Sequence, residues 1–346
     1  MAGQVREPDA LDGESGRASL RSFLEGYFGE QPEHFSVTKI SGGQSNPTFF
    51  VDYGARRLVL RKQPPGKLLP GAHAIDREFR ALQALNPTDV PTPRAVLLYG
   101  ERDVLGTPFY IMERLEGRVF HDCSLPGLVP EERRQVYFGL AEAMAKMHAV
   151  EPEKVGLGDF GRPGNYFQRQ IARWTRAYNE SPSERIPALD RLVEWLPANM
   201  PGDDGRVAIA HGDFRLGNML YHPTEPRVVG ILDWELATLG HPLADLAFAC
   251  IPWRTTPEQY GGIRGLDHKA LGIPSEEEFV AHYYRHARPT SELKPFHMAF
   301  ALFRFSVIFL GINDRVRAGN AAGEDAAKLE PLAREMAERA VEAIDG

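Results

Sequence analysis

Cysteine, positive charge and long apolar runs are scarce in this sequence, and each shortage excludes a class of protein. The 346 residues include two cysteines, Cys123 and Cys250, too few for a disulfide framework or a cysteine-based zinc site. This content favours a reduced, cytoplasmic setting. Lys and Arg number 40 against 47 Asp and Glu, a formal net charge of −7, so we expect no nucleic acid as a partner.

We expect no membrane as a partner either. The first 16 residues are polar and lack the apolar core of a signal peptide. Apolar runs such as residues 246–251 are far shorter than the roughly 20 residues that span a bilayer. Residues 1–16 also offer little to bury, so we predict that they form a disordered tail.

The first third of the chain predicts a small antiparallel sheet. An amphipathic helix is expected around residues 20–28 and a second one over 73–85, where apolar residues recur at helical spacing. Strand-like runs separated by turns lie at residues 35–40, 47–53, 57–62, 95–99 and 109–114.

The rest of the chain is mostly helical. Helical patterns cover residues 131–150, 165–180, 189–198 and the chain from about 276 onward, and a strand–loop–strand unit interrupts them near residues 207–235. This order predicts an α+β fold with two lobes and a cleft between them. We expect an N-lobe over residues 17–114 and a helical C-lobe over 115–346.

The motif HGDFRLGN, residues 211–218, is the strongest chemical signal. Because strand-like runs flank it, the loop can hold Asp213 and Asn218 in one small region. A carboxylate there can accept a proton from an attacking hydroxyl, and an amide oxygen can bind a hard cation such as Mg²⁺. A polar turn with a capping Asp is the plainer interpretation of this motif taken alone.

A second motif, ILDWE at residues 231–235, follows soon after. Asp233 ends an apolar strand-like run, 15 residues beyond Asn218. It can supply a second oxygen ligand, since Mg²⁺ sites in proteins use one or two carboxylates together with substrate phosphates. A strand-end Asp in an ordinary turn is the alternative, but both motifs at this spacing are hard to ascribe to chance.

Together, HGDxxxxN and DWE resemble the aminoglycoside phosphotransferase and choline kinase superfamily, the small-molecule relatives of protein kinases. The resemblance implies a protein-kinase-like fold and an ATP- and Mg²⁺-dependent kinase acting on a hydroxyl group of a small molecule. It implies that Asp213 is the catalytic base or hydroxyl-orienting group. Asn218 and Asp233 would be the magnesium ligands, with Glu235 near the second metal or its waters.

The nucleotide-binding side chains implied by the resemblance lie in the first third of the chain. The turn SGGQSN would cover the ATP phosphates with Gly42, Gly43 and Ser45, although it lacks the full GxGxxG spacing. Strand alternation places Arg61 and Lys62 on opposite faces, and the superfamily pattern selects Arg61 as the phosphate-pairing residue. Its helix partner would then be Glu78.

Adenine is expected at the segment YIMERLEG, which joins the lobes. Main-chain groups near Glu113 and Leu115 would bind the ring, and Met112 would lie behind it. Further along, we expect Asp245 to hold the backbone near His211, with both residues structural rather than catalytic.

The acceptor region is less clearly marked. We expect it at about residues 158–178 and 253–297, where cationic and aromatic side chains mix, namely Arg162, Arg169, Arg173, Arg176, Tyr166, Phe167 and Trp174. This mixture favours an anionic or partly apolar acceptor over a polycation, unless the arginines lie on a solvated helix face.

A second resemblance concerns the acceptor. The segments GGQSNPTFF and GRPGNYFQRQIARW are similar to the kinase-like domain fused to acyl-CoA dehydrogenases, which implies a hydroxyacyl-CoA or hydroxy acid. The alternatives are an aminoglycoside-type antibiotic kinase and a nucleotide-binding module without transfer activity. The sequence leaves the oligomeric state, ATP or GTP preference and regulation undecided.

Overall fold

The computed structural model describes residues 9–40, 46–66, 74–162, 164–288, 291–317 and 326–346. Internal contacts divide the chain into two units. Unit 1 is Met1–Gly117 with Val229–Ala237, and unit 2 is Arg118–Val228 with Thr238–Gly346. Residues 229–237 thus belong with unit 1, whereas the sequence-based division placed everything after residue 114 in one lobe.

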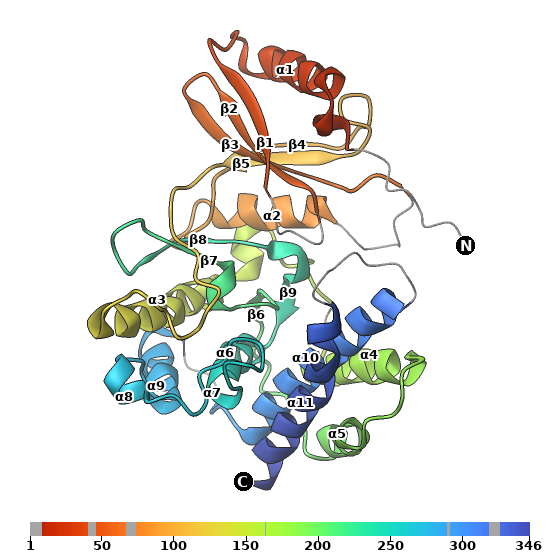
Figure 1. The fold of residues 1–346 in the computed structure, drawn as a ribbon, viewed down its shortest axis with the longest axis vertical. Helices are drawn as coiled ribbons and strands as arrows, with labels where there is room; N and C mark the ends of the chain where they lie inside the picture. Colours follow the sequence, from red (N-terminus) through yellow and green to blue (C-terminus); the bar gives the residue numbers. More distant parts are fainter. Residues whose placement is uncertain (1–8, 41–45, 67–73, 163, 289–290, 318–325) are drawn as a thin grey trace. The chain divides into compact units, whose positions relative to one another are not determined.

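Unit 1 is built on an antiparallel sheet of order β1-β2-β3-β5-β4. Figure 1 shows α1 and α2 on opposite sides of this sheet. Its elements are η1 (Ala10–Asp12), α1 (Glu14–Phe28), β1 (Phe35–Lys39), β2 (Thr48–Tyr53), β3 (Arg56–Lys62), α2 (Ile75–Leu85), β4 (Ala95–Tyr99), β5 (Phe109–Glu113) and η4 (Trp234–Leu236).

Strand alternation decides which helix covers which face of the sheet. On β2, Phe49 and Val51 are buried and pack with Leu20 and Leu24 of α1 in one apolar cluster. On the opposite face, Tyr110 of β5 packs against α2. Burial of the apolar side chains on both faces stabilises the sheet between its two helices.

The N-terminal tail is shorter than the sequence predicted. The prediction of disorder is wrong for residues 9–16, because η1 and the start of α1 occupy them. Leu11 is 1% exposed within the α1 cluster, and the Asp9 carboxylate lies 3.0 Å from Lys62 Nζ. These two anchors offset the entropy of ordering the segment. Residues 1–8 lie outside the described part of the chain.

Unit 2 is mainly helical. Its helices are α3 (Pro130–Ala149), η2 (Pro152–Val155), α4 (Tyr166–Glu180), α5 (Pro187–Ala198), η3 (Leu216–Asn218), α6 (Pro242–Ala249), α7 (Ile251–Arg254), α8 (His268–Leu271), α9 (Glu276–His286), α10 (Pro295–Arg317) and α11 (Ala326–Asp345). Its strands are β6 (Ala208–Ala210), β7 (Met219–Tyr221) and β9 (Thr238–Gly240), while β8 (Val228–Ile231) runs across the unit boundary.

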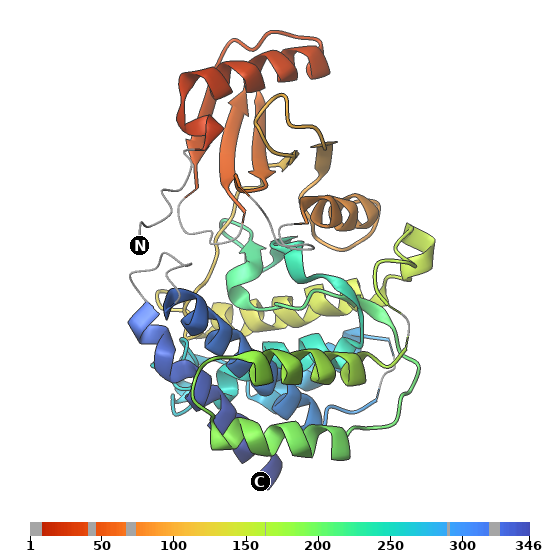
Figure 2. The same cartoon turned by 90° about the vertical axis from the view of Figure 1, so that its right-hand side faces the viewer.

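Helix α10 forms the centre of unit 2. It packs along α11 and also contacts α4, α5, α6 and α7, as Figure 2 shows for α4, α5 and α11. The helix is long and apolar enough to cross a membrane, but 78% of its apolar window is buried inside the protein. Such burial is typical of a core helix, although the apolar segment is longer than expected from the sequence.

Candidate active site

The loop between β6 and β7 holds the HGDFRLGN motif. Asn218 ends the short helix η3, so its side chain returns toward the start of the loop. Its amide nitrogen donates to the Asp213 carboxylate at 2.6 Å and to the Asp213 carbonyl at 2.8 Å. Arg215 Nε lies 3.3 Å from the same carboxylate. Asp213 is therefore fixed by two neighbours, yet its side chain keeps 22% exposure and can meet a substrate.

A buried carboxylate from α6 holds the start of this loop. Asp245 accepts hydrogen bonds from the backbone nitrogens of His211 at 2.7 Å and Gly212 at 2.9 Å. His148 Nε2 lies 3.3 Å from the same carboxylate. Burial by itself would raise the pKa of Asp245, but the His148 hydrogen bond, neighbouring positive charge and the Gly212 N–H lower it below its usual value. The predicted structural role of Asp245 is confirmed.

His211 serves the same loop. Its Nδ1 accepts from the backbone nitrogen of Asp213 at 3.2 Å, and the residue is completely buried. The guanidinium of Arg304, from α10, also donates to the Gly212 carbonyl. The loop is thus held from α6 and α10, and no pattern in the sequence marked Arg304 for this role.

Unit 1 has its own cluster of charged side chains, centred on Arg61 of β3. The Arg61 guanidinium lies 3.1 Å from Glu78, 2.9 Å from Asp233 and 3.6 Å from Glu235. The predicted pairing of Arg61 with Glu78 is confirmed. Three carboxylates therefore surround one guanidinium, so that the ionised cluster carries excess negative charge. Hard oxygen donors with surplus negative charge suit a divalent cation such as Mg²⁺, so Asp233 and Glu235 fit the expected metal.

Glu78 is the buried member of this cluster. It is 1% exposed, and it accepts from Asn46 Nδ2 at 2.8 Å and from the Tyr110 hydroxyl at 3.1 Å. Burial raises the pKa of Glu78 to about 7, with Asp233 and Glu235 adding to the effect and Arg61 opposing it. The protonation of Glu78 is thus coupled to the charge around Arg61.

Arg61 and Lys62 point to opposite faces of the sheet, as the strand alternation predicted. Arg61 faces α2, whereas Lys62 lies on the α1 side, 1% exposed and paired with Asp9. Lys62 is therefore committed to the fold of unit 1. Of these two cations, it is Arg61 that lies among the carboxylates of the cluster.

The backbone at Asp233 adopts an uncommon conformation, with φ +64° and ψ +64°. This left-handed geometry is infrequent outside glycine, although Asp tolerates it better than most residues. It turns the chain from β8 into η4. Local strain of this kind gathers at functional sites, and the sequence alone did not reveal it.

The structure says less about the other residues predicted to bind the nucleotide. Gly42, Gly43 and Ser45 lie outside the described residues. Met112 lies on the same face of the sheet as Arg61, because Val59 and Arg61 pair with Met112 and Tyr110. Met112, Glu113 and Leu115 are all half-buried at the end of β5 and just beyond it.

A cavity of about 840 Å³ occurs in unit 2, and part of its lining comes from the predicted acceptor region. Tyr166, Phe167, Arg162 and Arg169 line it, while Arg173 and Arg176 are exposed elsewhere on α4. The wall also contains carboxylates, namely Glu151, Glu153, Asp159, Asp203 and Asp204. The cavity is thus of mixed charge rather than mainly cationic. Of these carboxylates only Asp159 lies in the region predicted for the acceptor, so the acidic share was not apparent from the sequence.

Comparison with known proteins shows the family and the fold. Residues 36–282 match the model of the phosphotransferase enzyme family. A crystal structure from Ralstonia eutropha, assigned by name to the aminoglycoside phosphotransferases, is 43% identical with a TM-score of 0.84, over 94% of this chain and 98% of that one. Aminoglycoside phosphotransferase APH(4)-Ia, solved with ADP and hygromycin B, shares the fold at 18% identity, with a TM-score of 0.63 over 95% and 99% of the two chains.

Several curated relatives carry a different name. Acyl-CoA dehydrogenase family member 11 of Rattus norvegicus is 39% identical over 95% of this chain, and the probable acyl-CoA dehydrogenase IBR3 of Arabidopsis thaliana is 41% identical over 91%. The chain spans only 43% and 40% of their lengths. Both resemblances expected from the sequence are therefore confirmed, as is the kinase-like α+β fold. This chain belongs to the phosphotransferase enzyme family.

Proposed function

We propose that the protein is an ATP- and Mg²⁺-dependent phosphotransferase that phosphorylates a hydroxyl group of a small molecule. The observation that carries this proposal is the fixed Asp213 carboxylate, bonded to Asn218 at 2.6 Å and still partly exposed. A carboxylate held in this way can orient an acceptor hydroxyl and take its proton as the oxygen attacks phosphorus.

Other side chains have supporting roles in this proposal. Arg61 neutralises charge on the nucleotide phosphates, and Glu78 keeps its guanidinium in place. Asn218, Asp233 and Glu235 would hold Mg²⁺, which neutralises phosphate charge when bound. Met112, Glu113 and Leu115 would lie along the adenine, and Gly42, Gly43 and Ser45 along the phosphates.

We propose a hydroxyacyl-CoA or hydroxy acid as the acceptor. The names of the curated relatives supply one support, since acyl-CoA dehydrogenases act on acyl-CoA thioesters. The cavity of unit 2 supplies another, because it combines aromatic walls with Arg162, Arg169 and Lys154, which suit an apolar chain and an anionic group. An antibiotic acceptor is the competing possibility, because the same wall contains five carboxylates.

The test is ATP consumption with Mg²⁺ across a panel of hydroxyacyl-CoAs, free hydroxy acids, choline-like alcohols and kanamycin. Asp213→Ala is measured beside the wild type, and Asp89→Asn, at an exposed carboxylate of unit 1, serves as the matched control. We expect turnover with a hydroxyacyl compound that is lost in Asp213→Ala and kept in Asp89→Asn. Turnover with kanamycin alone would instead identify an antibiotic kinase, and turnover that survives in Asp213→Ala would contradict the assigned role.

A further inference from the structure

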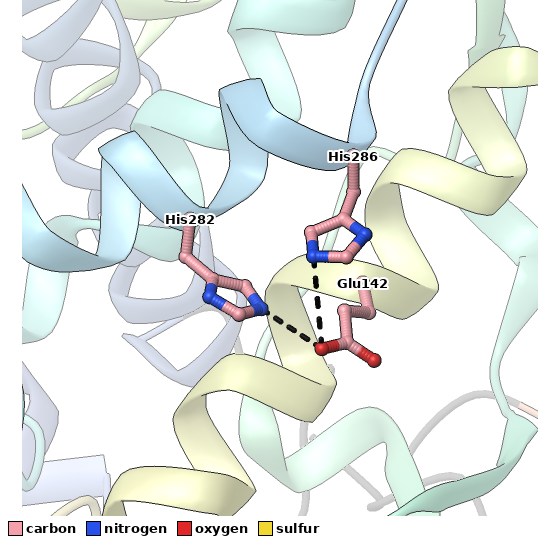
Figure 3. A group of neighbouring side chains, drawn as sticks. All are labelled: Glu142, His282 and His286. Atoms are coloured by element: carbon pink, nitrogen blue, oxygen red, sulfur yellow. Dashed lines mark hydrogen bonds and ion pairs between the residues drawn. The ribbon is translucent and has the colours of Figure 1, made fainter.

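A cluster of two histidines and one glutamate lies between α3 and α9, apart from the catalytic loop. His282 and His286 are four residues apart on α9, so they project from one face of the helix. Glu142 projects from α3, which packs against α9. His282 Nε2 lies 2.8 Å from Glu142 Oε1, and His286 Nε2 lies 3.9 Å from the same oxygen. Figure 3 shows both rings turned toward this carboxylate.

A simple contact between the helices explains only part of this arrangement. The bond from His282 to Glu142 is a normal hydrogen bond. At 3.9 Å, however, His286 is beyond hydrogen-bond distance of the carboxylate. The ligand atoms of all three residues nevertheless lie within 4.8 Å of one another. The His286 ring lies beside that of His282, with centroids 4.7 Å apart, and no hydrogen bond to Glu142 accounts for the position of the second imidazole.

The geometry points to a zinc site, and we propose that Glu142, His282 and His286 bind Zn²⁺. Two imidazoles and a carboxylate are a common zinc ligand set, with a fourth position left for water. Ligand atoms of a tetrahedral zinc site lie roughly 3.3 Å apart, and the two distances of 2.8 and 3.9 Å bracket that spacing. Glu142 and His286 are 43% and 46% exposed, so both the ion and its water can enter.

One neighbour of His282 favours zinc binding by its imidazole, and another competes with it. The Phe138 ring stacks on the imidazole, with centroids 4.0 Å apart and planes 3° from parallel, which fixes the ring plane. Arg285 donates to His282 Nδ1 at 2.7 Å, so the metal-free ring carries its proton on Nε2. Zinc binding through Nε2 moves that proton to Nδ1, and the exposed Arg285 side chain must then turn away.

Binding of zinc would join α3 and α9 at a point that matters for the catalytic loop. Tyr283 follows His282 on α9, and its hydroxyl lies 2.8 Å from His148 Nδ1 on α3. The other ring nitrogen of His148 contacts Asp245, which holds the loop backbone. Zinc bound at this site would therefore stabilise the pair α3 and α9. This pair positions His148, which in turn contacts Asp245.

The experiment uses the tag-free protein, stripped of metal with a chelator. Zn²⁺ is titrated in competition with a chromophoric indicator, in excess Mg²⁺ so that hard-oxygen sites are filled. We expect one Zn²⁺ per chain, with binding weakened about tenfold or more in His282→Ala, His286→Ala and Glu142→Gln. His222→Ala is the matched control, because His222 also lies beside a glutamate, Glu225, but belongs to no metal-ligating group among the described residues. Its affinity should equal that of the wild type.

Two further measurements separate a ligand from a residue needed only for folding. Thermal unfolding should shift upward with Zn²⁺ in the wild type and His222→Ala, but not in His286→Ala, whose exposed position leaves the fold intact. Arg285→Ala should bind Zn²⁺ severalfold more tightly, because the competing hydrogen bond to Nδ1 is gone. Absence of stoichiometric binding, or equal affinity in His286→Ala and the wild type, would overturn the proposal.

Discussion

Unit 1 and unit 2 each hold a cluster of polar side chains, but by different means. In unit 1, Arg61 is held by three carboxylates, and the cluster depends on the balance of charge. In unit 2, Asp213 belongs to a loop whose backbone N–H groups are tied to Asp245. We expect the first arrangement to respond to a bound charge and the second to keep one carboxylate in place. The predictions below separate these two behaviours.

The largest expected effect is that of Asp213→Asn. The substitution keeps the shape of the side chain but removes the proton acceptor, so kcat should fall by about 10³-fold. Nucleotide affinity should stay near the wild-type value, since Asp213 is proposed to contact the acceptor hydroxyl and neither the nucleotide nor its Mg²⁺. Steady-state kinetics and a nucleotide-binding titration check the two halves of this prediction. Asp233→Asn should instead weaken binding of Mg-nucleotide. If both variants changed kcat and nucleotide affinity alike, the proposed difference between Asp213 and Asp233 would be wrong.

Asp245→Ala should mainly affect stability. It leaves two buried backbone N–H groups without their carboxylate, which we expect to cost about 3 kcal/mol in the free energy of unfolding. Urea denaturation measures the change. Asp267→Ala is the control, because Asp267 also accepts from a backbone N–H, that of Ala270 at 3.0 Å, but is exposed. Its loss should cost about 1 kcal/mol or less.

Arg61→Met and Lys62→Met should differ although the residues are adjacent. Arg61→Met removes a charge from the acidic cluster, and we expect nucleotide binding to weaken about thirtyfold, or about 2 kcal/mol. Lys62→Met leaves Asp9 without its partner on the other face of the sheet, so unfolding should become easier while nucleotide binding is kept. Nucleotide titration and thermal unfolding of both variants check this prediction. It would be wrong if Lys62→Met weakened nucleotide binding and Arg61→Met lowered only the stability.

The smallest expected effect is the dependence of stability on pH. It has opposite signs for a carboxyl group of unit 1, Glu78, and one of unit 2, Asp245. The raised pKa of Glu78 means that its contribution to stability is full below its unfolded value of 4.5 and is lost as the pH rises through about 7. The lowered pKa of Asp245 means that its contribution is present above 3.8 and is lost as the pH falls below that value. Thermal unfolding of Glu78→Gln across pH 5 to 8 should show a flatter dependence than the wild type.

Much of the fold could be predicted from periodicity alone. The predicted strand at residues 95–99 has the same bounds in the structure, and the helix expected at 131–150 is displaced by one residue at each end. The strand β9 was missed, since its three residues, Thr238–Gly240, are too short to show an alternation. This strand forms because it pairs with β6, not because its residues favour a strand by themselves.

The candidate site was predictable where a motif carried it. The HGDxxxxN motif indicated that Asp213 and Asn218 lie in one small region, and strand alternation indicated that Arg61 and Lys62 face opposite ways. Arg304 and Glu142 gave no such signal, because each acts with residues more than 90 positions away in the sequence. Asp9 looked like part of a disordered tail because its partner, Lys62, is also remote in the sequence.

The family, the HGDxxxxN spacing and the order of most helices and strands could be predicted from the sequence, since these follow from local residue patterns. Which charges meet depends on the packing of segments that are far apart in the sequence. It placed the carboxylates of Glu78, Asp233 and Glu235 around Arg61, gave the cavity of unit 2 its acidic wall and brought Glu142 to the two histidines of α9. Electrostatic interactions and metal ligation depend on distances of a few ångströms between remote segments, and only the packed core sets those distances.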